Sequence, residues 1–137
     1  GGCSDPALQG TGEEGMDCES RMNRYTDERG YIQEVSEGDY KAIQMIWSRK
    51  GAVRSNHYHK TGGHLLYVVS GSMRYLERRV GDTATAERTV SAGESVFTGP
   101  MIEHATEFLE DTLLVCAATV NRADGAYADD LVKVKLL

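Results

Sequence analysis

The sequence lacks the features that mark several large classes of protein. It has only three cysteines, Cys3, Cys18 and Cys116, and no Cys-x-x-Cys pair, so it predicts neither a disulfide scaffold nor a zinc knuckle. Its longest apolar run, 113–118, is far shorter than the roughly 20 residues that a membrane-spanning helix needs. No basic start followed by an apolar segment indicates a secretory signal. We therefore predict a cytoplasmic protein with no membrane partner.

Positive charge is also scarce, most of all near the start of the sequence. The 137 residues carry a formal net charge of −6, and residues 1–20 contain five acidic residues and no basic one. The rest of the chain is nearly balanced and has no basic stripe, so we predict no nucleic-acid partner. Because the acidic, Gly-rich head has almost no apolar periodicity, we predict a flexible segment over residues 1–24 and a single folded domain over residues 25–137.

Helical periodicity of useful length is missing as well. From Gly30 onward, short runs rich in β-branched and aromatic residues alternate with Gly, Asp and Ser turn signals, which is typical of a sandwich or barrel. We predict an all-β jelly roll barrel with a loop over 121–130. The expected strands are 31–35, 40–48, 53–59, 64–70, 73–80, 83–90, 95–98, 104–109, 112–119 and 131–136.

The chemistry of the chain is concentrated in its four histidines. His57 and His59 stand at i and i+2 of an expected strand, so both rings point to one face. A Thr-Gly-Gly turn then places His64 at the start of the next strand, and His104 follows downstream. Imidazole is the commonest metal-ligand side chain, so rings converging from neighbouring strands predict a metal site.

The spacing of these histidines resembles the two motifs of the cupin superfamily. Gly51, five residues, His57-Tyr58-His59, four residues, His64, six residues and Gly71 follow the first motif, with His64 where the family usually has Glu. The eleven-residue step from Gly93 to His104 follows the second motif. The resemblance covers roughly residues 29–136 and implies a cupin-type double-stranded β-helix whose metal ligands are His57, His59, His64 and His104.

Strand alternation describes the rest of the expected pocket. Counting from His64 and His104 places four side chains on the same face, which gives an apolar pocket suited to a small organic ligand. These four are Leu66, Val68, Thr106 and Phe108. Counting from the histidines turns Arg54, Asn56, Tyr58 and Glu103 away from the pocket unless a bulge intervenes.

The resemblance leaves several functions open. Four neutral ligands suit a divalent transition metal, namely Fe, Zn, Ni, Mn or Cu, and we predict a metal-dependent, dioxygenase-type oxidoreductase acting on a small oxygenated substrate. The alternatives are a sugar or sugar-nucleotide isomerase or epimerase, and a non-catalytic cupin that binds a metal or ligand. The isomerase needs a general base, for which Tyr58, Tyr67 and Tyr75 are the candidates by sequence.

The expected partners are a small-molecule substrate and a second copy of the chain. Cupins commonly dimerise through edge strands, and the strand over 31–35 is a candidate edge that a partner could cover. We therefore predict a homodimer.

Overall fold

The fold is seen in a computed structural model, which describes residues 23–120 and 125–137. The flexible segment predicted over residues 1–24 lies outside the described residues except for Asn23 and Arg24. Within the described part, no helix combines the length and the apolar character needed to cross a membrane.

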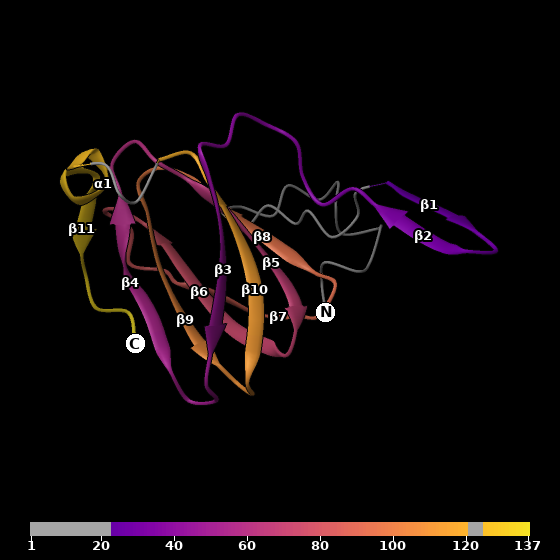
Figure 1. Cartoon of the computed structure of the whole chain (residues 1–137). Coiled ribbons are helices and arrows are strands. Elements are labelled where there is room, and N and C mark those ends of the chain that lie inside the picture. Colours follow the sequence, from indigo (N-terminus) through magenta and orange to yellow (C-terminus); the bar gives the residue numbers. More distant parts are fainter. Residues whose placement is uncertain (1–22, 121–124) are drawn as a thin grey trace.

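The described residues form eleven strands and one short helix (Figure 1). Most strands lie within a few residues of the ranges that the sequence predicts. They are β1 (Arg24–Asp27), β2 (Gly30–Gln33), β3 (Ala42–Ser48), β4 (Val53–His59), β5 (His64–Ser70), β6 (Ser72–Arg79), β7 (Ala86–Ser91), β8 (Ser95–Thr98), β9 (Ile102–Phe108), β10 (Thr112–Ala118) and β11 (Leu131–Lys133), with α1 (Gly125–Asp130) between β10 and β11.

Two antiparallel sheets face each other and enclose the core. One has the strand order β3-β10-β5-β8, and the other has the order β11-β4-β9-β6-β7. Apart from β6 and β7, neighbouring strands in these orders are not consecutive in the chain, which is the pattern of a jelly roll. Strands β1 and β2 form a separate hairpin that projects from one side, and α1 and β11 lie at the opposite end (Figure 1). The prediction of an all-β jelly roll is confirmed.

The core lies between the sheets and follows the period of two that strands impose. Side chains from both sheets meet there, and Val68, Met73, Tyr75 and Val90 are fully buried in it. Because each sheet turns one face inward, alternate residues on its strands supply the apolar contacts. The same packing fixes where β4, β5 and β9 present their histidines.

Three parts of the predicted secondary structure need correction. The segment predicted as a loop over 121–130 contains α1, which the sequence does not signal because six residues are too few to show a helical period. Strand β1 lies in a stretch for which no strand was predicted, and β11 is shorter than the strand predicted over 131–136.

Gly71 in the turn between β5 and β6 offers a test of the packing between sheets. Its φ is +95°, and a Cβ atom there would lie 2.6 Å from the carbonyl oxygen of Asp111. Gly81 has a φ of +94° with nothing within 4 Å of the same position. We expect Gly81→Ala to cost about 1 kcal/mol from backbone strain and Gly71→Ala about 1–3 kcal/mol more from the clash. Urea denaturation of the two variants measures the difference, and equal losses would contradict the clash.

Candidate active site

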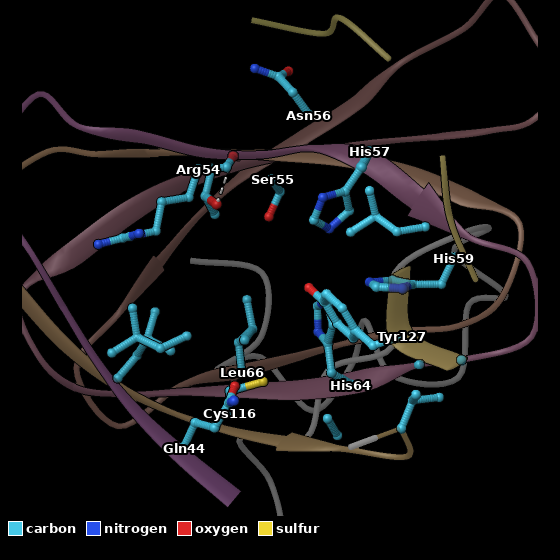
Figure 2. A pocket seen from close by; sticks show the side chains of 18 of the residues that line it. Gln44, Arg54, Ser55, Asn56, His57, His59, His64, Leu66, Cys116 and Tyr127 are labelled. Atoms are coloured by element: carbon cyan, nitrogen blue, oxygen red, sulfur yellow. Dashed lines mark hydrogen bonds between the residues drawn. The ribbon is translucent and has the colours of Figure 1, made fainter. Parts of the chain in front are cut away.

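A cavity of about 710 Å³ lies between the two sheets. His57, His59 and His64 lie at one end of it, and His104 is not among its lining residues. Leu66 and Cys116 lie toward the other end, together with the polar side chains of Arg54 and Gln44 (Figure 2). Leu66, Thr106 and Phe108 line the cavity as strand alternation predicts, but Val68 is fully buried in the core. The cavity is large enough for a sugar-sized ligand and is only partly polar, which is typical of small-molecule sites.

The four predicted histidines lie close together in the fold and come from three different strands. His57 and His59 stand on β4, His64 on β5 and His104 on β9. The ring centroids of His57 and His59 are 4.9 Å apart, and those of His57 and His104 are 4.7 Å apart. Both His57 and His59 face the cavity, because residues i and i+2 of a strand share a face (Figure 2).

The tautomers of the two deepest rings follow from their hydrogen bonds. His104 Nδ1 lies 2.9 Å from the carbonyl oxygen of Ile102, which can only accept, so this nitrogen carries the proton. His104 Nε2 is then the acceptor for the Nε2–H of His64, 3.2 Å away. His64 Nδ1 is therefore unprotonated, and it is buried without a hydrogen-bond partner.

Both of these rings are neutral at physiological pH. Burial, with smaller contributions from His59 and His57, lowers the pKa of His64 to about 3. Burial and the neighbouring His64 hold the pKa of His104 well below its usual value. A buried imidazole without a counter-charge resists protonation because the charged form loses its hydration.

Acid should therefore destabilise the fold through these rings. An unfolded histidine takes up a proton near pH 6.5, whereas folded His64 does so only near pH 3. Unfolding thus becomes easier as the pH falls below about 6.5, by about 1.4 kcal/mol per pH unit for each such ring. Urea denaturation between pH 7 and pH 5 should show this dependence of the unfolding free energy on pH. The variant His64→Asn should reduce the slope by the contribution of one ring. An unchanged slope in the variant would contradict the assignment.

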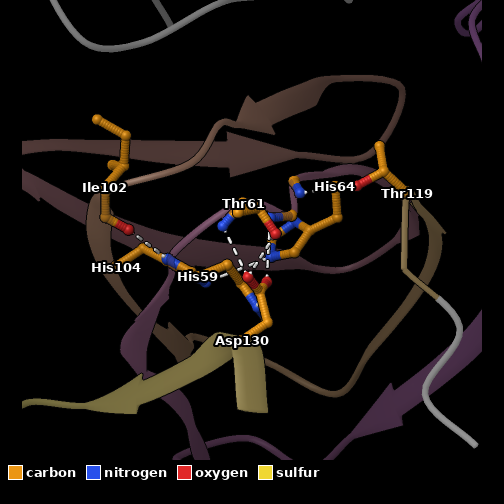
Figure 3. Close-up of polar contacts among 9 residues, drawn as sticks. His59, Thr61, His64, Ile102, His104, Thr119 and Asp130 are labelled. Atoms are coloured by element: carbon orange, nitrogen blue, oxygen red, sulfur yellow. Dashed lines mark hydrogen bonds and ion pairs between the residues drawn. The ribbon is translucent and has the colours of Figure 1, made fainter. Parts of the chain in front are cut away.

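A histidine–aspartate pair lies beside the cavity and was not predicted from the sequence. His59 Nδ1 lies 3.3 Å from Oδ2 of Asp130, and both side chains are buried (Figure 3). Asp130 also accepts hydrogen bonds from the Thr61 amide at 2.6 Å, the Thr61 hydroxyl at 2.7 Å and the Gly62 amide at 3.0 Å. The pair is thus held by the turn that follows β4.

The charge of Asp130 sets the tautomer of His59. Burial raises the pKa of Asp130, but the hydrogen bonds from Thr61 and Gly62 lower it more, and its net shift is downward. An ionised carboxylate can only accept, so His59 Nδ1 carries the proton and donates it to Asp130. His59 Nε2 is then the unprotonated ring nitrogen, which is the protonation state that a general base needs.

Tyr127 of α1 adds a hydroxyl to the same end of the cavity. Its ring centroid lies 5.7 Å from that of His59, and its side chain reaches into the cavity (Figure 2). Tyr127 was not among the candidate bases predicted from the sequence. Tyr75 was one of them, but it is buried in the core with its hydroxyl hydrogen-bonded to Thr98. Nothing in the sequence near residues 127 and 130 marks these two residues, because only the fold brings α1 to β4.

A bulge in β4 changes which side chains reach the cavity. Ser55 and Asn56 have φ angles of 73° and 56°, and the register against β9 shifts between Ser55 and His57. Arg54 therefore lines the cavity, where its Nε donates to Ser48 Oγ at 2.8 Å, although regular alternation had predicted that it points away. Glu103 is directed to a salt bridge with Arg78 at 2.6 Å.

Three of the histidines also satisfy the geometry of a metal-binding group. His57, His59 and His104 each offer a ring nitrogen, and these atoms lie within 4.8 Å of one another. His64 is not part of this group and instead lies within hydrogen-bond distance of His104. Geometry alone does not separate ligands from bases, because a neutral imidazole nitrogen serves either purpose.

The double-sheet barrel with a histidine-lined interior cavity defines this chain as a cupin-type jelly roll. Its sequence matches the profile of the polysaccharide biosynthesis C-terminal domain family over residues 25–128. The chain belongs to that family. No curated protein is significantly similar to it in sequence.

Solved structures with the same fold include sugar-nucleotide enzymes and a polysaccharide-assembly protein. The dTDP-4-dehydrorhamnose 3,5-epimerase from Sulfolobus tokodaii has a TM-score of 0.67 and 20% identity, covering 82% of this chain and 73% of that one. A 3,4-ketoisomerase from Helicobacter canadensis has a TM-score of 0.72 and 14% identity, covering 86% and 90%. The capsular polysaccharide assembling protein CapF from Staphylococcus aureus has a TM-score of 0.64 and 23% identity. The match covers 84% of this chain but only 34% of CapF.

These comparisons correct the predicted function. Epimerases and ketoisomerases rearrange a sugar by moving protons, without net oxidation, whereas a dioxygenase consumes oxygen at a redox metal. The prediction of a dioxygenase-type oxidoreductase is wrong, and so is that of a divalent transition metal as its cofactor. The placement of His57, His59, His64 and His104 at the functional site remains a prediction.

Proposed function

We propose that this chain is an epimerase acting on a keto sugar attached to a nucleoside diphosphate. The observation that carries the proposal is the His59–Asp130 pair at the cavity, with Tyr127 beside it. The family match to polysaccharide biosynthesis and the fold shared with sugar-nucleotide epimerases support it. A 3,4-ketoisomerase is the second candidate, because it needs the same first proton transfer.

The first step is removal of a proton from the carbon next to the ketone. His59 Nε2 accepts this proton, and the electrons of the broken C–H bond form the carbon–carbon double bond of an enolate. Asp130 holds the ring in the required tautomer and stabilises the imidazolium that forms. His57 faces the cavity beside His59 and is placed to hydrogen-bond the ketone oxygen, where negative charge develops.

The second step returns a proton to carbon. For epimerisation, the proton reaches the opposite face of the same carbon, so a second group must supply it. We assign this proton donation to the Tyr127 hydroxyl, because Tyr127 lines the same cavity but stands on α1, whereas His59 stands on β4. The tyrosinate regains its proton from water, and His59 gives its proton back to water, so that neither residue is consumed.

Two cations suit the diphosphate of such a substrate. Arg54 and Lys133 are exposed, and both line the cavity on neighbouring strands. A guanidinium forms paired hydrogen bonds with phosphate oxygens, and an ammonium adds positive charge. The described residues that line the cavity include no Asp or Glu, whose negative charge would repel these phosphates.

The proposal has a direct test in turnover. The purified chain is incubated with nucleoside-diphosphate 4-keto-6-deoxy sugars, and the products are separated and identified by NMR. We expect inversion next to the ketone, and a 3-keto product would support the ketoisomerase instead. If no tested sugar nucleotide is changed, the proposed function is wrong.

Metal removal should leave this activity intact. Proton transfer by His59 and Tyr127 needs no Lewis acid, so activity after prolonged treatment with EDTA should stay within about twofold of the untreated protein. Metal analysis of the treated sample provides the control. If activity is lost and returns on addition of one divalent ion, the reaction depends on a metal, and the conclusion that no transition-metal cofactor is needed is wrong.

We also propose that the chain forms a homodimer. The strand predicted as its edge, β2, pairs only with β1, in a two-stranded hairpin whose Tyr25, Tyr31 and Ile32 are exposed. Strand β3 is an edge of its sheet and exposes Ile43 and Met45. An exposed apolar patch on an edge strand is typical of a surface that binds a partner. Sedimentation at micromolar concentration should give twice the chain mass, and a monomer would overturn this proposal.

A further inference from the structure

The bulge in β4 is held in an uncommon conformation directly before His57. Two consecutive residues other than glycine, Ser55 and Asn56, have left-handed φ angles of 73° and 56°. Residues other than glycine rarely adopt this backbone conformation, and asparagine tolerates it better than most of them. Such backbone strain persists only where contacts with surrounding residues hold the conformation in place, and it is common at functional sites.

The surroundings that hold Asn56 are the residues that follow β11. Asn56 Oδ1 accepts hydrogen bonds from the backbone amides of Leu136 at 2.9 Å and Leu137 at 3.1 Å. Its Nδ2 donates to the Leu137 carbonyl at 3.3 Å, and its own carbonyl accepts from the Val134 amide at 2.9 Å. The Asn56 side chain thus fastens residues 136 and 137 to the middle of β4, and its backbone carbonyl fastens residue 134.

The Asn56 side chain and the His57 ring lie on opposite sides of the strand (Figure 2). Asn56 is among the residues that border the cavity, but its side chain is directed to the opposite side of β4 from those of Ser55 and His57 (Figure 2). Lys133, which pairs with His57 in register, leads directly into the fastened segment. The amide of Asn56 therefore fixes the backbone from which the His57 ring projects, without touching the ring's side of the strand.

We propose that Asn56 is a positioning residue for His57. Its side-chain amide locks the bulge by tying it to residues 136 and 137, and the locked bulge aims the His57 ring at the cavity. The catalytic part of this inference rests on the proposed function, in which His57 binds the ketone oxygen. The geometric part rests on Asn56 and His57 alone.

Three substitutions separate the contributions of the backbone and the amide. Asn56→Gly keeps the left-handed backbone accessible but removes the side-chain hydrogen bonds. Asn56→Asp keeps the acceptor for both amides and loses only the donor. Asp111→Ala is the matched control, because Asp111 also accepts a hydrogen bond from a distant backbone amide, that of Lys50 at 2.9 Å, away from the cavity.

The histidine-ring 1H–15N spectrum is the first readout and needs no substrate. His57 is assigned by the signal missing from His57→Gln. In Asn56→Gly, the His57 signals should shift and broaden while those of His64 and His104 stay in place. Asn56→Asp should change the His57 signals less, and Asp111→Ala should leave them unchanged. His57 signals that are the same in Asn56→Gly as in wild type would overturn the proposal.

Turnover is the second readout and separates positioning from simple stability. Asn56→Gly should lower kcat by about 10- to 100-fold with KM within about threefold, because a small misplacement of a catalytic group is costly. An unchanged kcat for the folded Asn56→Gly variant would overturn the catalytic part of the proposal. Wild type that converts no sugar nucleotide would instead refute the proposed function, and the ring spectrum would still decide whether Asn56 positions His57.

Discussion

Replacing His59 by glutamine should lower kcat by about 10³-fold, which is the typical contribution of a positioned general base. The glutamine side chain fills a similar volume and can still bond to Asp130, but it has no basic nitrogen to accept the substrate proton. KM should change little, because the cations proposed to bind the diphosphate, Arg54 and Lys133, are untouched. Steady-state kinetics with the sugar nucleotide that wild type converts measures both quantities.

The control for this variant is Lys60→Ala, because Lys60 follows His59 in sequence and is exposed. Its kinetics should match those of wild type. A His59→Gln protein that is folded and retains more than about a tenth of wild-type kcat would show that another group is the base.

Changing Asp130 to asparagine should have at least as large an effect on catalysis, through the tautomer of His59. The amide NH₂ of asparagine can donate to His59 Nδ1, which moves the ring proton to Nε2 and blocks the base. A comparable change of tautomer in a catalytic triad costs about 10⁴-fold in kcat, and we expect a loss of about 10³- to 10⁴-fold here. The three donors from Thr61 and Gly62 also lose a charged acceptor, which should cost about 1–3 kcal/mol of stability.

Asp129→Asn is the matched control, because Asp129 is the adjacent residue of α1 and is exposed. It makes the same chemical change without touching His59. The 15N shifts of the His59 ring should show the proton on Nδ1 in wild type and in Asp129→Asn, and on Nε2 in Asp130→Asn. Equal kinetics for the two variants would contradict the role of Asp130.

The sequence was sufficient to predict the barrel and the gathering of the histidines. Alternation along single strands is a local property, so it correctly placed His57 beside His59 and directed Thr106 and Phe108 to the cavity. The motif glycines Gly51, Gly71 and Gly93 stand in turns, before β4, between β5 and β6 and between β7 and β8, and each has a positive φ. These features depend on short-range rules that a sequence displays directly.

The partners of His59 could not be predicted, because they depend on contacts between distant residues. Asp130 is 69 residues from Thr61, and it reaches the site only after β11 pairs with β4. Tyr127 lies on a helix too short to show a period. The bulge at Ser55 and Asn56 likewise has no signature in the sequence, so regular alternation misplaced Arg54.

The error in the predicted chemistry has a related cause. Converging neutral imidazoles suit both metal ligation and proton transfer, and the carboxylate that favours the second lies outside the histidine motif. Once Asp130 is placed on His59 Nδ1, the pair has the donor and acceptor arrangement of a base and its orienting group. That pairing, rather than the histidine count, supports the sugar-nucleotide epimerase proposed above.

Solvent deuterium uptake tests the central proposal most directly. The wild-type chain, with a nucleoside-diphosphate 4-keto-6-deoxy sugar in D₂O, should place one deuterium on the carbon next to the ketone, seen as a gain of one mass unit and loss of that proton's NMR signal. His59→Gln should show no uptake above the rate without protein. Product formed by wild type without deuterium, or equal uptake in His59→Gln, would contradict proton transfer by His59.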